Sequence, residues 1–205
     1  MTILEIKKIM KSSFEDIPSF DYTFGTSLKE CELIVQKSKQ RLDLFSVNEI
    51  EFLSLILLER NAYEVLQSCI LSSSENAFIK IWEENMDSLL SKIPVTHRKT
   101  IYRNDQYCDI TYLKSLYENQ KAYKVNHYLT CSKDFLPIGR CKIKFMIHPL
   151  REGTKAHSVY MLYNFGRNRE GCKPEWQIEY EKGTEFKISS INQKGGYYVV
   201  HLNEI

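Results

Sequence analysis

The sequence has almost no excess of charge of either sign. Its 205 residues include 28 Lys and Arg against 26 Asp and Glu, so the formal net charge is only +2. This balance excludes a strongly basic protein that binds polyanions over its whole surface, but it does not exclude a local basic groove. The hydrophobic fraction is 43% and the charged fraction is 26%, which excludes a chain that is disordered throughout.

The sequence also lacks a long apolar run. No stretch reaches the roughly 18 to 20 uninterrupted apolar residues that a membrane span needs. Charged residues interrupt the apolar positions of the first segment, MTILEIKKIMKSSFEDI, so this segment does not read as a secretory signal peptide. We therefore expect no membrane partner and a cytoplasmic location.

Closely spaced cysteine and histidine motifs are absent. The six cysteines are Cys31, Cys69, Cys108, Cys131, Cys141 and Cys172. None forms a C-x-x-C pair, and the five histidines are scattered along the chain. A disulfide framework usually accompanies a smaller secreted chain. We expect reduced, mostly buried thiols and no metal site.

The first part of the chain, residues 1–94, has the pattern of a helical region. Apolar residues recur at helical spacing, and Ser46 with Glu49 forms an S-x-x-E capping box that opens a helix reaching to about residue 60 or beyond. A further helix is expected over 74–91, and Pro94 ends it. Nothing in this region indicates catalysis, and its apolar stripes read as helix core.

The pattern changes to short strands from about residue 95 onward. Tyr, Ile and Val alternate with polar residues, and Gly195-Gly196 predicts a hairpin turn between the last two strands. The expected strands are 100–103, 122–132, 141–147, 159–163, 177–180, 185–191 and 197–202, with a helix over 109–118. The fold class is therefore α+β, with a helical region at 1–94 and a mostly antiparallel core at 95–205.

Three short motifs follow one another along the strand-rich part. The first is Ile101-Tyr102-Arg103, and the second is Tyr128-Leu129-Thr130-Cys131-Ser132. The third begins at Glu175-Trp176-Gln177 and continues through the turn and strand Glu181-Lys182-Gly183-Thr184-Glu185-Phe186-Lys187-Ile188. Each motif alone is common, and only their order along the chain is informative.

Together these motifs resemble the ADP-ribosyltransferase family of the Arg, Ser-Thr-Ser, Glu-x-Glu type. That family has an Arg on its first core strand, an S-T-S strand, and then E-x-E or Q-x-E before a Gly-Thr-like turn. The resemblance spans about residues 100–191, and the length and layout are similar to those of the small T-even phage enzymes. It implies a two-sheet core and a mono-ADP-ribosyltransferase that uses NAD as co-substrate. The acceptor would be a protein side chain or a nucleic-acid base.

Two positions depart from the family pattern. The second motif reads Thr130-Cys131-Ser132 in place of S-T-S, which keeps a hydroxyl at both ends. Counting back from Gly183, the position of the catalytic Glu holds Gln177, so the third motif reads E-x-Q. Moving the motif to Glu179-x-Glu181 restores two carboxylates but sets the second beside the turn, so we prefer Glu175 and Gln177.

The exchange at residue 177 matters because of the chemistry. Cleavage of the nicotinamide–ribose bond builds an oxocarbenium-like cation, which a carboxylate stabilises and a neutral amide does not. Two explanations stay open: an engineered inactivating substitution of a natural Glu, or a naturally degenerate enzyme. Beside the transferase, two further hypotheses stay open: a catalytically dead binding module with this fold, and an unrelated α+β protein in which the motifs coincide.

The resemblance also implies roles for individual residues around NAD. Arg103, preceded by Tyr102, would hold the diphosphate or its adjoining ribose, because a guanidinium pairs with two oxygens at once. Thr130, in the Thr130-Cys131-Ser132 strand, would support the catalytic side chain, and Ser132 would brace the pocket wall. Phe135 would stack on nicotinamide, with packing at the core or rim as the alternative.

The acceptor side is expected to involve Glu175 and the loop before it. In this family a Glu at that position goes with an Arg or other amino-type acceptor, and a Gln goes with Asn or guanine. Phe165, Arg167 and Arg169 on the loop would touch the acceptor. Nearby Lys142, Lys144, Arg151 and Lys155 form either part of a basic groove for nucleic acid or an ordinary solvated face. A role as a toxin or as a phage-defence effector would require an antitoxin or inhibitor partner.

Overall fold

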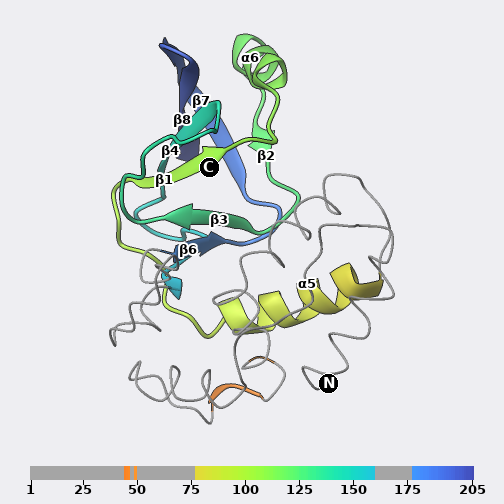
Figure 1. Ribbon diagram of the computed structural model, residues 1–205. Coiled ribbons are helices and arrows are strands. Elements are labelled where there is room, and N and C mark those ends of the chain that lie inside the picture. Colours follow the sequence, from red (N-terminus) through yellow and green to blue (C-terminus); the bar gives the residue numbers. More distant parts are fainter. Residues whose placement is uncertain (1–43, 47–48, 50–76, 160–176) are drawn as a thin grey trace. The chain divides into compact units, whose positions relative to one another are not determined.

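The computed structural model describes residues 44–46, 49, 77–159 and 177–205 (Figure 1). The chain divides into two compact units, Met1–Ile93 with Tyr160–Glu175 and Pro94–Val159 with Trp176–Ile205. The predicted helix from 46 to about 60 lies almost wholly outside the described residues. So does the predicted strand 159–163, apart from Val159.

The described part of the first unit is built around helix α5, Ala77–Leu90. It lies inside the predicted span 74–91, and it ends four residues before Pro94. The predicted capping box is confirmed, because the Ser46 amide donates to Glu49 Oε2 at 2.6 Å and the Glu49 amide donates to Ser46 Oγ at 3.2 Å. The buried Glu49 carboxylate also forms an ion pair of 2.6 Å with Lys92. One carboxylate thus caps its own segment and ties it to the residues after α5.

The second unit contains one mixed sheet of eight strands in the order β2-β7-β8-β4-β1-β3-β6-β5 (Figure 1). The strands are β1 Ile101–Asp105, β2 Tyr123–Lys124, β3 Leu129–Ser132, β4 Ile143–His148, β5 Ala156–His157, β6 Gln177–Tyr180, β7 Glu185–Lys194 and β8 Tyr197–Glu204. Every pair is antiparallel except β4 with β8. Helix α6, Ile110–Glu118, is capped by the Asp109 side chain and lies beside β7.

The sequence predicted a two-sheet core, whereas hydrogen bonds join all eight described strands into a single sheet. Strand β1 makes the junction. It pairs along its whole length with β4 but shares only the pair Tyr102↔Ser132 with β3. Because one side of the sheet is joined to the other through a single registered pair, the two halves are linked by a narrow seam.

The prediction of one continuous strand over 122–132 is wrong, because two separate strands form there. Residues Tyr123–Lys124 pair with β7, and residues Leu129–Ser132 pair with β6, which lie on opposite sides of the seam. Between the two strands, the Val125 amide donates a hydrogen bond to the Thr184 carbonyl at 3.0 Å, next to the start of β7. The chain therefore has to cross from one half of the sheet to the other. The short strand β5 was not predicted.

Two glycine turns hold the strands around β7 in register. Gly183 has φ 82° in the turn from Glu181 to Thr184, a backbone conformation that the third residue of a type II turn requires. Gly195 has φ 58° in the two-residue connection between the paired Lys194 and Tyr197, which confirms the predicted Gly195-Gly196 hairpin.

The core of the second unit lies on one face of this sheet. Its buried apolar side chains include Ile101, Phe145, Ile147, Ile178, Phe186, Val200 and Leu202, with Leu113 and Leu116 from α6. Neither of the two helices in the described residues is long and apolar enough to span a membrane.

A buried carboxylate near the end of the chain fastens a loop to the sheet. Glu204, only 4% exposed, accepts hydrogen bonds from the amides of Leu150 at 2.9 Å and Lys155 at 2.7 Å. It also accepts from the hydroxyl groups of Thr154 at 2.6 Å and Tyr180 at 3.4 Å. Four donors from three segments therefore depend on one side chain.

We expect Glu204→Ala to lower the free energy of unfolding by about 3 kcal/mol, because it leaves several buried donors without an acceptor. The melting temperature should fall by roughly 5–10 °C. The control is Glu185→Ala, since Glu185 pairs with Lys124 on the surface at 3.2 Å and should cost less than about 1 kcal/mol. Chemical denaturation of the two variants measures both free energies of unfolding. Equal losses of stability in the two variants would contradict the anchoring role of Glu204.

Candidate active site

Strand pairing brings parts of all three motifs together at the seam of the sheet. Tyr102 lies opposite Ser132, Ser132 lies opposite Gln177, and Thr130 lies opposite Glu179. Residues directly opposite each other in antiparallel strands project from the same face, so these five side chains share one face of the sheet. Segments that lie about 30 to 75 residues apart in the sequence thus converge there.

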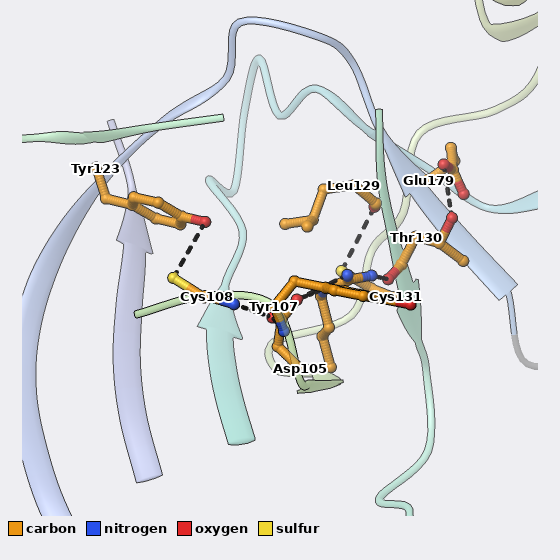
Figure 2. Close-up of polar contacts among 9 residues, drawn as sticks. Asp105, Tyr107, Cys108, Tyr123, Leu129, Thr130, Cys131 and Glu179 are labelled. Carbon is orange, nitrogen blue, oxygen red and sulfur yellow. Dashed lines mark hydrogen bonds and ion pairs between the residues drawn. The ribbon is translucent and has the colours of Figure 1, made fainter. Parts of the chain in front are cut away.

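The centre of this cluster is the carboxylate of Glu179. The Thr130 hydroxyl donates to Glu179 Oε1 at 2.8 Å, and the Gln177 amide nitrogen lies 3.3 Å from Glu179 Oε2. Figure 2 shows Thr130 and Glu179 pointing toward each other from neighbouring strands. Glu179 is only 2% exposed. Burial raises the pKa of its carboxyl to about 7, against the opposing effects of the hydrogen bonds from Thr130 and Gln177 and of the Arg103 charge.

The sequence interpretation set the key position of the third motif at Gln177, but the structure places Glu179 against Thr130. Gln177 lies one residue pair further along, opposite Ser132. Counting back from Gly183 gives Gln177 as the key position, whereas the cross-strand register gives Glu179 as the residue opposite Thr130. The signal was present, since Gln177-Ile178-Glu179 itself reads Q-x-E. Glu175 lies outside the described residues.

Arg103 is buried and engaged within the protein. Its Nε and Nη2 bind Asp105 Oδ2 at 2.8 and 2.7 Å, and its Nη1 donates to the Thr130 carbonyl at 2.8 Å. Arg103 thereby fixes the main chain at the residue whose hydroxyl holds Glu179. Its predicted contact with the NAD diphosphate stays a prediction.

Asp105 completes this support. Its other oxygen accepts from the amides of Tyr107 at 2.8 Å and Cys108 at 2.7 Å, contacts that are drawn in Figure 2. Burial alone would raise the pKa of Asp105, but Arg103 and the two amides outweigh it and lower the pKa below its ordinary value. At neutral pH the pair is therefore an ionised, buried ion pair.

The remaining residues of the second motif have different surroundings. Cys131 alternates with Thr130 and Ser132 along β3, is buried, and lies opposite Ile178. Burial raises the pKa of its thiol well above the ordinary value, so the group stays neutral and is a poor nucleophile. Ser132 holds the next loop, donating to the Asp134 carbonyl at 2.9 Å and accepting from the Asp134 amide at 3.1 Å.

Phe135 follows directly and is 60% exposed. Its ring meets the edge of Tyr102 with centroids 5.5 Å apart. The alternative of packing in the core does not fit this exposure. Lys144 is buried beneath the same loop and contributes no surface charge to the basic groove considered from the sequence.

The predicted acceptor residues Phe165, Arg167 and Arg169 lie outside the described residues. Over the ranges that the structure does describe, no group of three or more His, Cys, Asp and Glu side chains is arranged to hold a metal ion.

Comparison with known proteins places this arrangement in a structural context. No protein-family model and no curated protein matches the sequence. Among solved structures, the ADP-ribosyltransferase HopU1 of Pseudomonas syringae superposes with a TM-score of 0.59 at 15% identity, over 98% of this chain and 97% of that chain. The C3 exoenzyme of Clostridium limosum gives a TM-score of 0.57 at 16% identity, over 88% of this chain and 95% of that one.

A third similar structure is exoenzyme S of Pseudomonas aeruginosa, solved with human 14-3-3 protein beta and bound to carba-NAD. Its TM-score is 0.57 at 16% identity, over 98% of this chain and 88% of that chain. These likenesses are structural, with little sequence identity. The chain therefore has the fold of the bacterial mono-ADP-ribosyltransferases.

Proposed function

We propose that this protein is a mono-ADP-ribosyltransferase that transfers ADP-ribose from NAD to a macromolecular acceptor. The observation that carries the proposal is the buried Glu179 carboxylate, held by Thr130 and Gln177 where the three motifs meet. The fold supports it, and so does the carba-NAD bound to exoenzyme S, a protein of the same fold.

The reaction breaks the bond between the nicotinamide nitrogen and C1′ of the ribose. The bonding electrons leave with nicotinamide, and the ribose acquires oxocarbenium character. In the proposed site the ionised Glu179 stabilises this cation and accepts a hydrogen bond from the ribose 2′-hydroxyl. A nitrogen of the acceptor then bonds to C1′ and releases its proton.

The neighbours of Glu179 prepare it for this step. Thr130 orients the carboxylate through the 2.8 Å hydrogen bond, and Arg103 holds the Thr130 carbonyl from behind. A group preorganised in this way needs little rearrangement when charge develops on the substrate. Because Glu179 supplies the carboxylate, Gln177 is no longer required to be a disabled catalytic residue.

Gln177 then has a role toward the acceptor. It lies two residues before Glu179 on the same strand face, the position where the family resemblance associates Gln with Asn or guanine acceptors. Its amide has both a donor and an acceptor, which complements an amide side chain or the edge of a guanine base. We therefore propose an amide-like acceptor, in place of the amine-like acceptor that Glu175 suggested.

The biological setting is proposed on the same basis. Exoenzymes with this fold support a toxin or effector role. A phage-defence setting, an antitoxin or inhibitor partner and a cytoplasmic location remain predictions from the sequence.

Glu179→Gln should lower the transfer of labelled ADP-ribose into a cell lysate by about 10²–10³-fold, because it removes the charge and keeps the shape. The matched control is Glu181→Gln, since Glu181 is a neighbouring carboxylate whose side chain is 42% exposed and binds His157 at 2.9 Å. The assay uses biotinylated NAD on native protein and both variants, with nuclease and protease treatment to identify the acceptor class.

Two outcomes would contradict this assignment. One is labelling by Glu179→Gln at the native rate. The other is a native protein that labels nothing while Gln177→Glu labels strongly, which would restore Gln177 as the disabled catalytic position. A native protein that binds NAD without turnover would favour the binding module.

Gln177→Ala should separate transfer from hydrolysis. Transfer to the macromolecule should fall by about tenfold or more, the loss expected for one hydrogen bond to the acceptor. The slow hydrolysis of NAD by water should fall less, by about threefold, because Glu179 loses its 3.3 Å contact with Gln177 but keeps the 2.8 Å hydrogen bond from Thr130. Measuring nicotinamide release with and without lysate tests this, and an equal loss of both activities would place Gln177 at the NAD side.

The pH dependence follows from the pKa of Glu179, which burial raises from 4.5 to about 7. NAD cleavage should increase as pH rises through about 7, because only the ionised carboxylate stabilises the cation. Between about pH 4.5 and 7 the folded state holds a proton that the unfolded state has released, so native stability should fall with rising pH.

By pH 8 the native protein should have lost about 3 kcal/mol of its free energy of unfolding, at about 1.4 kcal/mol per pKa unit. The reference is Glu179→Gln, whose amide does not titrate in this range. Denaturant titrations of both proteins at pH 5 and pH 8 measure it. A stability difference that is the same at both pH values would show that Glu179 titrates normally.

A further inference from the structure

Lys144 on strand β4 is a buried lysine. Only 1% of the residue is exposed, and it is among the largest fully buried side chains of the described residues. Its ammonium donates to the Leu136 carbonyl and lies 3.5 Å from the centroid of the Phe135 ring. In the part of the chain that the structure describes, no carboxylate forms an ion pair with it.

Burying an ammonium in this way is costly. Lysine is almost never fully buried unless it is paired, since removal from water disfavours the charged form. Burial accordingly lowers the pKa of Lys144 below its ordinary value. A carbonyl and an aromatic face compensate only part of this loss. The position therefore calls for a reason beyond stability.

The groups that Lys144 contacts belong to one loop. This loop begins after Ser132, at the end of β3. Its Leu136 carbonyl accepts a hydrogen bond from the ammonium, and its Phe135 ring makes a cation–π contact with it. Asn104, the registered partner of Lys144 on β1, donates from its side chain to the next carbonyl, that of Pro137, at 2.6 Å. Two neighbouring side chains of the sheet thus bind consecutive carbonyls of the loop.

The result of this anchoring is a fixed but exposed aromatic ring. Phe135 is 60% exposed even though its loop is held on both sides. It meets Tyr102, which lies opposite Ser132 next to the Gln177 and Glu179 pairings. An exposed apolar ring that is held in place beside Tyr102 is suited to stacking on a flat ligand group.

We propose that Lys144 is a positioning residue that holds the Phe135 loop in place for NAD binding. This inference rests on the proposed function and adds a residue that no motif identified. The ammonium acts through Phe135 and Leu136 and does not touch the substrate. A lysine suits the task because one compact charge binds a carbonyl and an aromatic face together.

The test compares Lys144→Met with Lys187→Met, in which an exposed lysine of strand β7 is changed in the same way. Binding of NAD is measured by calorimetry, and loop order by hydrogen exchange of the 133–137 amides. Lys144→Met should weaken NAD binding about tenfold, the effect of losing a desolvated cation–π contact, and should speed exchange in the loop. In steady-state kinetics the KM should rise with kcat nearly unchanged. Lys187→Met should match the native protein.

A double-mutant cycle tests whether Lys144 acts through Phe135. Phe135→Leu alone should weaken NAD binding to a similar degree, and the double variant should be no weaker than either single variant. Additive losses would show that the two residues act independently and would overturn the inference. Phe135→Leu also covers the case in which Lys144→Met does not fold, because the ring is mostly exposed. Unchanged loop exchange and unchanged affinity in Phe135→Leu would then overturn the inference.

The outcomes separate the two proposals. Native protein that does not bind NAD overturns the proposed function and this inference together. Native protein that binds and cleaves NAD, with Lys144→Met indistinguishable from it in affinity and loop exchange, overturns the role of Lys144 alone.

Discussion

The register between strands β3 and β6 is the constraint on which the site depends. Thr130 lies opposite Glu179, and Ser132 lies opposite Gln177. A slip of one residue would turn the whole β6 pattern over and set an apolar or aromatic side chain against Thr130. A slip of two toward the start of β6 would set Gln177 there and leave Thr130 with a neutral partner. On its other side β6 pairs with β5, and the Glu181 amide donates to the Lys155 carbonyl at 3.0 Å, so β6 is held on both sides in the register that places a carboxylate against the hydroxyl.

Four ionisable side chains around this seam are buried, and their partners explain why the fold tolerates them. The opposite charges of Arg103 and Asp105 stabilise each other in an ion pair, so both groups remain charged. Glu179 accepts hydrogen bonds from the Thr130 hydroxyl and the Gln177 amide, and burial raises its pKa to about 7 against these bonds and the Arg103 charge. Lys144 has a carbonyl and an aromatic ring. The last two are the groups for which we propose functions, as expected when stability is given up at a working site.

Local chemistry made much of the fold predictable. The Ser46–Glu49 capping box, the Gly195-Gly196 hairpin and the strand 177–180 all follow from neighbouring residues, and the structure confirms them. The break between β2 and β3 and the single sheet were not predictable in this way, because both depend on which distant strand each segment pairs with. The same limit explains the site. Arg103 and Thr130 are proposed from motifs, whereas which residue of β6 lies opposite Thr130 depends on the cross-strand register, which spacing from a turn does not determine.

We propose above all that Glu179 is the carboxylate that contacts the reacting ribose. Its most direct test is a crystal structure of the Glu179→Gln protein with intact NAD. We expect the side-chain oxygen of residue 179 to accept a hydrogen bond from the 2′-hydroxyl of the nicotinamide ribose, while Thr130 still donates to residue 179. A ribose bound instead against Gln177 or Glu175, with residue 179 remote from it, would show that Glu179 is not the carboxylate that stabilises the cation.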